Sequence, residues 1–392
     1  MIVRQFLHWV RTASAGERAE ATSALARAYL YSDLSPDDRA AAEGAMIMLL
    51  DDRSPLVRRA MAEALAASAE APPAVIHALA GDQPEIAALV LARSPLFIDA
   101  ELVDFVALGD GAVQIAIAGR RELPCSVAAA VAEVGSPEAC LVLLENPEAA
   151  IATFSVDRIV ERFGHLGAIR EVLFGREDLP AATRQALVSK LAQALAEFVA
   201  GREWLGRDRA ERVAKEACEK ATIALAADTL GTEVRPLIRH LRHTGQLTAG
   251  LVLRALLSGN VVMFEEALAE LSGLPLGRVR GLVHDRGNAG FRALFERAGL
   301  PASTYPAFRE AVGALREAGS FGELGGASRL KRRMIERVLT GCGDAPVGEI
   351  EPLLILLRRF ATEAAREEAR LYCEELVADD YIGFDAAERA AA

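Results

Sequence analysis

Short apolar segments, each opened by a polar turn, recur along the first 150 residues of the chain. The clearest copy is DDRSPLVR at residues 51–58, which leads into an alanine-rich apolar run. An equivalent apolar position after the turn recurs at Val57, Ile86, Val113 and Ala139, at intervals of 29, 27 and 26 residues. A period of this length predicts a helical solenoid, in which each repeat buries its apolar side against its neighbours.

Proline and glycine divide this array into pairs of short helices, because both residues are accepted at helix ends and disfavoured inside helices. The first helices of the repeats are expected to begin near Pro55, Pro84, Gly111 and Pro137. Their partners are expected to begin near Pro72-Pro73, Asp99-Ala100, Pro124 and Pro147. Alternating, β-branched runs typical of strands are nearly absent. The sequence therefore predicts an all-α fold, a HEAT-like α-solenoid of short antiparallel helix pairs wound as a right-handed superhelix.

The pattern changes after residue 154, where two longer helices are predicted near residues 181–228, at 181–201 and 208–228. The charge changes too. Residues 1–150 hold 11 Lys and Arg against 21 Asp and Glu, whereas the remainder holds 33 against 34. We therefore expect an acidic N-terminal part, 1–154, with the repeat array, and a C-terminal helical domain, 155–392, that continues the solenoid.

This acidic part would be repelled by nucleic-acid phosphates and by anionic membrane surfaces. No uncharged apolar run reaches 18 residues, so no membrane span is predicted. The five cysteines are scattered without a C-x-x-C spacing, which argues against a zinc finger or a disulfide framework. Free, mostly buried thiols in a reducing cytoplasm are the expected state, and the protein is expected to be cytoplasmic.

The run from Leu49 to Leu65 resembles a HEAT-type repeat, in which an Asp in the turn and an Arg that opens the next helix join successive turns. Asp51 or Asp52 and Arg58 match these positions, whereas the later copies have lost the Arg. The chain as a whole resembles an uncharacterised bacterial family of HEAT-like proteins, a domain of unknown function. The matching segments are Trp9-Val10, Ala28-Tyr29-Leu30, residues 51–58, Ser94-Pro95-Leu96, Phe264-Glu265, Val279-Arg280 and His284-Asp285. These are packing motifs, and the resemblance implies no functional residues.

Two histidine patterns are candidates for chemical sites. His240 and His243 lie three residues apart on a predicted helix, but neighbouring arginines disfavour a metal there, and a basic solvated face is the preferred interpretation. His284-Asp285 resembles part of a phosphohydrolase motif without its other ligands, and capping of a helix end by Asp285 is preferred. We therefore predict no catalytic site, no metal, no cofactor and no enzymatic activity.

The densest basic cluster is a candidate partner surface, although a solvated helix start is the preferred interpretation. It comprises Arg329, Lys331, Arg332 and Arg333. The function predicted for such a solenoid is a non-catalytic protein–protein interaction scaffold or regulatory adaptor, with another protein as partner and neither nucleic acid nor membrane. The alternatives are a nucleic-acid-binding solenoid, including a base-processing one, and a small-molecule or lipid sensor. The last alternative would need an enclosed apolar cavity between helices.

Overall fold

The computed structural model describes residues 9–10, 12–229, 231–285, 288–321, 334–340, 354–366, 369–370 and 372–373. Every regular element in this part of the chain is a helix, and no strand occurs within it. The all-α fold is confirmed. The chain divides into two compact units, Met1–Leu179 (unit 1) and Pro180–Ala392 (unit 2). The boundary expected from charge and repeat rhythm, at residue 154, is a different division and stays a prediction.

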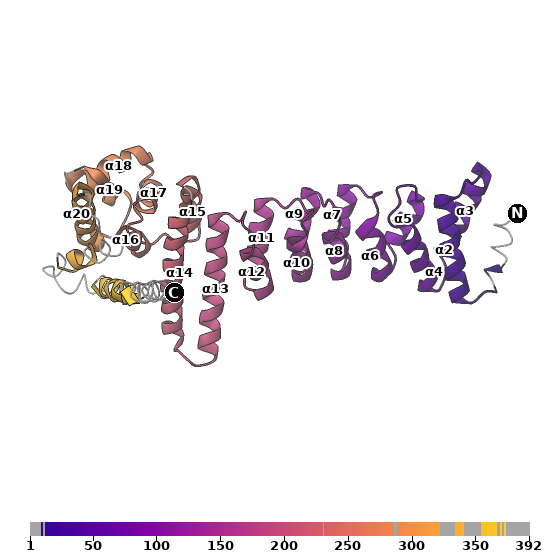
Figure 1. Ribbon diagram of the computed structural model, residues 1–392, viewed down its shortest axis with the longest axis horizontal. Coiled ribbons are helices and arrows are strands. Elements are labelled where there is room, and N and C mark those ends of the chain that lie inside the picture. The colour runs from indigo at the N-terminus through magenta and orange to yellow at the C-terminus, as the bar shows by residue number, and fades with distance from the viewer. Residues whose placement is uncertain are drawn as a thin grey trace, which may run out of the picture. The chain divides into compact units, whose positions relative to one another are not determined.

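Unit 1 is a two-layered stack of short helices (Figure 1). One row contains α2, α4, α6, α8, α10 and α12, each packed on the next, and α7, α9 and α11 lie side by side in the second row. The helices are α2 (Ala15–Tyr31), α3 (Pro36–Leu49), α4 (Pro55–Leu65), α5 (Pro73–Ala80), α6 (Pro84–Arg93), α7 (Asp99–Leu108), α8 (Gly111–Ala118), α9 (Cys125–Val134), α10 (Pro137–Glu145), α11 (Thr153–Phe163) and α12 (Gly167–Phe174). This arrangement is that of a helical solenoid, whereas the sense of its superhelix stays a prediction.

The repeated apolar position is buried in all four copies, as the periodicity predicted. Val57 and Ala139 are fully buried, and Ile86 and Val113 expose at most 7% of their surface. The helix predicted to begin near Pro147 is an exception, because α11 begins only at Thr153. The Asn146 side-chain amide donates to the carbonyls of Ala118 and Arg120. These hydrogen bonds hold residues 146–152 as a loop before α11.

Arginines and aspartates connect successive repeats in unit 1, but not in the pairing that the sequence suggested. Arg58 forms a two-pronged ion pair with Asp82 of the following turn, at 2.5 and 2.9 Å, and also donates to the Asp52 backbone carbonyl. The Asp52 carboxylate is instead held by Arg18 at 2.8 and 2.9 Å. In these two turns the Asp is therefore bound by an arginine of a preceding helix.

These ion pairs predict that unit 1 loses stability in acid. Hydrogen bonds from Arg18 lower the pKa of Asp52. Burial raises the pKa of Asp82, but hydrogen bonds from Arg58 and the Gln83 amide outweigh it and hold that pKa below its ordinary value. Because the unfolded chain binds these protons more readily, the stabilisation is complete above the ordinary aspartate pKa, about 3.9, and is lost below it. Urea unfolding between pH 3 and 6 should show a loss that Asp52→Asn together with Asp82→Asn reduces.

Unit 2 opens with the two long helices α13 (Ala181–Gly201) and α14 (Arg207–Asp228), as predicted. The others are α15 (Gly231–His243), α16 (Ala249–Leu257), α17 (Val261–Ser272), α18 (Leu276–His284), α19 (Asn288–Arg297), the short 3₁₀ helix η1 (Ala302–Thr304), α20 (Tyr305–Phe321), and helical segments at 334–340 and 354–366. Their core contains the fully buried rings of Phe264, Phe291, Phe295 and Phe308. This core supports the base of the α13–α14 pair.

A buried charge cluster joins α14, α16 and the segment 354–366. Arg254 is 6% exposed and lies between two carboxylates, 3.5 Å from Glu219 and 2.8 Å from Glu363. Its guanidinium also lies 4.1 Å from the centroid of the Phe360 ring. Since a buried carboxylate is stable as an anion only beside a compensating charge, Arg254 is the residue on which this junction depends.

Candidate functional site

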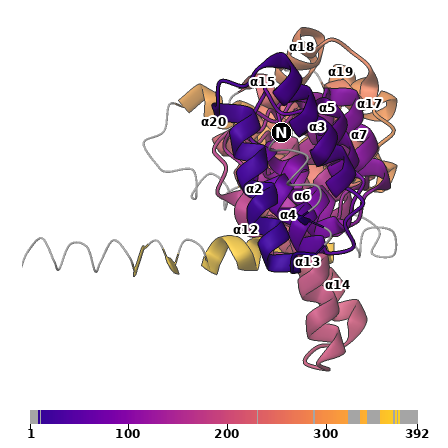
Figure 2. The ribbon, with the colours of Figure 1, turned by 90° about the vertical axis from the view of Figure 1, so that its right-hand side faces the viewer.

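The α13–α14 hairpin is the candidate functional site, because it combines a cavity on one face with an exposed apolar groove on the other. In both views the closed end of the hairpin extends beyond α15 of the same unit (Figure 1, Figure 2). Glycines at both sides of the connection end one helix and begin the next. The turn is completed by Glu203, which adopts a left-handed conformation, φ 58°. This geometry lets two long helices run antiparallel with only a short connection.

Small side chains set the separation of the two helices. Ala192 and Ala196 of α13 and Ala214 and Cys218 of α14 line both the cavity on one face and the groove on the other. They therefore form the thin layer between the two faces. Larger side chains here would push the helices apart.

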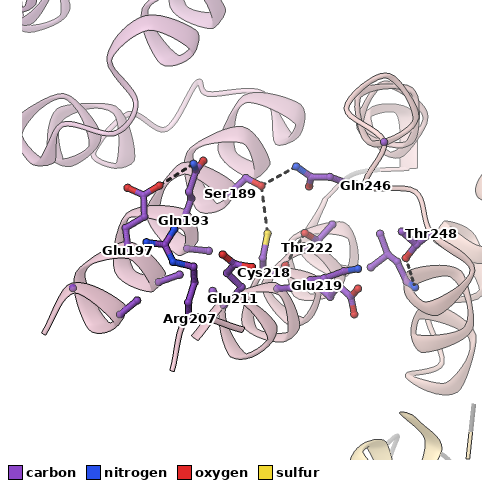
Figure 3. Close-up of a pocket in the computed structure, with 18 residues that line it drawn as sticks. Ser189, Gln193, Glu197, Arg207, Glu211, Cys218, Glu219, Thr222, Gln246 and Thr248 are labelled. Carbon is purple, nitrogen blue, oxygen red and sulfur yellow. Dashed lines mark hydrogen bonds between the residues drawn. The ribbon is translucent and has the colours of Figure 1, made fainter. Parts of the chain in front are cut away.

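The first face holds a cavity of about 570 Å³, which also reaches the loop before α16 (Figure 3). At its base, the Gln246 amide donates to Ser189 Oγ at 2.8 Å, and Gln246 Oε1 accepts from Gln185 at 2.6 Å. Ser189 Oγ lies 3.6 Å from Cys218 Sγ. These polar groups form one network, in which Gln185 Oε1 is buried without a hydrogen-bond partner among the described residues. The described contacts of the thiol include a hydroxyl and an amide, neither of which is a base that would activate it.

Charged side chains line the rest of this cavity. Glu197, Glu211 and Glu219 contribute acids, and Arg207 and Lys215 contribute bases. Burial raises the pKa of Glu219, and nearby Arg254 opposes that shift. The cavity therefore offers a ligand polar and charged contacts. It differs from the enclosed apolar pocket that would favour a lipid sensor.

The opposite face carries an apolar groove of about 310 Å³ between the same two helices. Apart from Cys218, only hydrocarbon side chains line it. The lining residues are Val188, Leu191, Ala192, Leu195, Ala196, Val199, Leu205, Ala210, Val213, Ala214, Ala217, Cys218 and Ala221. Leu195 and Val213 are 53% and 51% exposed although they lie in the middle of well-formed helices. A row of large apolar side chains open to solvent is typical of an interaction surface.

Two aromatic residues extend the apolar surface at the closed end of the hairpin. Phe198 is 50% exposed and Trp204 is 68% exposed, and their rings meet edge to face at 5.8 Å. The guanidinium of Arg202 lies 5.4 Å from the centroid of the Phe198 ring. Arg209 lies one turn before Val213 on the same side of α14. Basic side chains therefore border the apolar surface.

The family comparison covers this site. Residues 86–348 match the family described as "uncharacterised protein conserved in bacteria (DUF2336)". The chain belongs to this family. The matched range includes the whole α13–α14 hairpin, so the candidate site lies in the part of the chain on which membership rests. No curated protein matches the chain, and no solved structure matches it.

The sequence singled out a basic cluster and a His-Asp pair. Arg329, Lys331, Arg332 and Arg333 lie outside the described residues. His284 and Asp285 do not act together, because Asp285 caps α18 as expected, whereas His284 lies 2.8 Å from the buried carboxylate of Glu265. Arg280 binds the same carboxylate at 2.9 Å. The sequence interpretation did not join these residues, because Glu265 lies 15 residues from Arg280 and 19 residues from His284 along the chain.

The cysteines correct another expectation. Of the four that the structure describes, only Cys140 is buried, whereas Cys125 and Cys373 are exposed. Burial raises the pKa of the Cys140 thiol to about 11. The expectation that the thiols are mostly buried is therefore wrong for this set.

Within the described residues, no helix has the length and apolarity needed to cross a membrane.

Nucleic-acid binding is expected to be weak. On α15, where the sequence placed a basic face, Glu270 binds Arg242 at 3.0 Å and lies 3.7 Å from Arg239. These pairs reduce the charge available to phosphates. Fluorescence anisotropy with single- and double-stranded oligonucleotides at about 0.15 M salt should give dissociation constants no tighter than about 10⁻⁵ M. Sub-micromolar binding that disappears when Arg329, Lys331, Arg332 and Arg333 are neutralised would instead support the nucleic-acid alternative.

Proposed function

We propose that the protein is a non-catalytic interaction scaffold or adaptor of the bacterial cytoplasm, and that it docks a helical segment of another protein on the apolar face of α13–α14. The observation that carries this proposal is the groove between these helices, with Leu195 and Val213 half exposed at its centre. Leaving such a surface in water is unfavourable by roughly 25 cal/mol per Å² of apolar area that a partner would cover.

A helix is the occupant whose shape suits this groove. The lining positions on α13 and α14 recur every three or four residues, which is the spacing of the ridges that interdigitate when helices pack. On α13 the lining runs from Val188 to Val199, and spans about 16 Å at 1.5 Å per residue. A partner helix of about three turns would cover this length and complete a three-helix layer around the hairpin.

In this proposal the polar network on the opposite face has a structural role. The Ser189 hydroxyl accepts from Gln246 and the Gln246 carbonyl accepts from Gln185, so these groups hold the loop before α16 in place. Their arrangement fixes the base of the hairpin and leaves its closed end available for docking.

The size of the assembly that contains the protein in gently lysed cells tests this proposal. In the lysate, the wild-type chain should sediment faster than the same chain after purification, because in the lysate it is bound to its partner. Leu195→Glu, which places a charge in the groove, should sediment like the purified chain. Gln193→Glu is the matched control, because Gln193 lies on the same helix, is also exposed, and faces the cavity instead. Equal sedimentation of the wild-type chain and Leu195→Glu would refute docking on this face.

A further inference from the structure

We infer that the segment docked on the apolar face is an amphipathic helix with acidic side chains along the borders of its apolar stripe. This inference rests on the proposed function, and adds to it the chemistry of the partner. It is carried by the distribution of charge between the two faces of the hairpin.

The charged residues around the two faces differ, because acids together with Arg207 and Lys215 line the cavity, whereas arginines border the apolar surface. Three of the seven acidic residues between 181 and 228, Glu197, Glu211 and Glu219, line the cavity on the first face, and none lines the apolar groove. A fourth, Glu216, is bound by Arg359. The apolar surface is bordered by Arg202, which covers the Phe198 ring, and by Arg209, which is exposed beside Val213. A ligand on the apolar face therefore meets guanidinium groups at its edges.

Guanidinium groups at the edge of an apolar contact favour carboxylates on the partner. Arginine forms two parallel hydrogen bonds with a carboxylate, and its planar group remains stacked on an aromatic ring while it does so. Arg202 already lies over Phe198, so a glutamate arriving beside the groove would find this donor held in place. Charges of opposite sign at the border would also select the orientation of the incoming helix.

A second copy of the chain is a poorer occupant of this face. A symmetric dimer places the same patch on itself, so the Arg202 and Arg209 borders of the two copies would be brought together. The hairpin between residues 181 and 228 carries eight Lys and Arg against seven Asp and Glu, a net charge of +1, while the chain as a whole carries −11. The remaining −12 adds to the repulsion between two copies at low salt.

A displayed library of helical peptides provides the test. Each peptide of about 18 residues, five helical turns, would have leucine fixed at three- and four-residue spacing, and Glu, Lys, Gln or Ser at the flanking positions. The full-length chain is the bait. Selection should enrich Glu at the flanks, and Lys-flanked versions of the selected peptides should bind at least about tenfold more weakly. The preference for Glu should decrease as salt increases.

Variants of the bait separate the apolar from the charged contribution. Leu195→Glu should weaken binding of a selected peptide at least about thirtyfold, as expected for the centre of an interface. Arg202→Gln with Arg209→Gln should retain binding of a Gln-flanked peptide but abolish the preference for Glu. Gln193→Glu should bind like the wild-type chain, and circular dichroism of each variant checks that the helices remain intact.

Three results would overturn the inference. These are enrichment of Lys or no selection at the flanks, equal binding by Leu195→Glu, and a purified wild-type chain that sediments as a dimer which Leu195→Glu dissociates. The last result would assign the face to a second copy. If the flanks show no preference while the assembly in cell lysates still depends on Leu195, the inference fails and the proposed function stands. If that dependence is also absent, the proposed function fails with it.

Discussion

Arg254→Ala is expected to destabilise unit 2 by about 3–5 kcal/mol, the usual cost of removing one partner from a buried ion pair. Arg254 is the positive charge between Glu219 and Glu363, and its side chain is 7% exposed. Without it, the largely buried Glu219 loses its guanidinium partner, whereas Glu363, which is 30% exposed, keeps Lys220 at 3.4 Å. Urea unfolding followed by circular dichroism would measure the loss.

The dependence of this loss on pH identifies its cause. Burial already raises the pKa of Glu219, and removal of Arg254 should raise it further, so the folded variant holds a proton more tightly than the unfolded chain. Stability of the variant should therefore fall as the pH rises from 5 to 8. Arg254→Met combined with Glu219→Gln and Glu363→Gln removes the charges together, and should recover much of the lost stability. An Arg254→Ala protein as stable as the wild type would contradict this account of the junction.

Arg58→Ala is expected to destabilise unit 1 by about 1.5–3 kcal/mol, the range for hydrogen bonds to charged groups. The side chains of Arg58 and Asp82 are only 13% and 12% exposed, and Arg58 also binds the backbone carbonyl of Asp52. Because each repeat contacts chiefly its neighbours, the loss should concentrate in the first repeats. Hydrogen exchange of the α4 and α6 amides, together with thermal unfolding, would detect it.

Arg59 supplies a matched control for this prediction. It stands next to Arg58 and pairs with Glu63 at 2.8 Å, but the two side chains are 57% and 51% exposed. Solvent weakens such a pair, so Arg59→Ala should change stability by less than about 1 kcal/mol. Equal effects of the two substitutions would show that Arg58 contributes no more than a surface ion pair.

The fold of unit 1 could be predicted because its signals are local. Prolines at Pro55, Pro84 and Pro137 begin α4, α6 and α10, since proline fits the first position of a helix whatever surrounds it. Pro147 misled the same argument, because the Asn146 side chain binds carbonyls 26 and 28 residues earlier. The partner of Arg58 was also missed, since Asp82 lies 24 residues away and a closer aspartate matched the motif.

The candidate site could not be predicted from the sequence, although its helices could. Val188, Leu195 and Val199 recur with the spacing of any buried helix face, and periodicity does not show whether another helix covers that face. The structure shows that none of the described helices does so at Leu195, which remains half exposed. The position of Arg202 and Arg209 at the border of the apolar face likewise emerges only when α13 and α14 are paired.

The measurement that tests the central claim most directly is photo-crosslinking in living cells. A benzophenone amino acid would replace Leu195 in the groove, or Gln193 on the cavity face of the same helix. The account predicts a discrete crosslinked product from position 195 and not from position 193, joined to an acidic amphipathic helix of another protein. No product from position 195, or the same products from both positions, would contradict the claim that α13–α14 docks a partner through its apolar face.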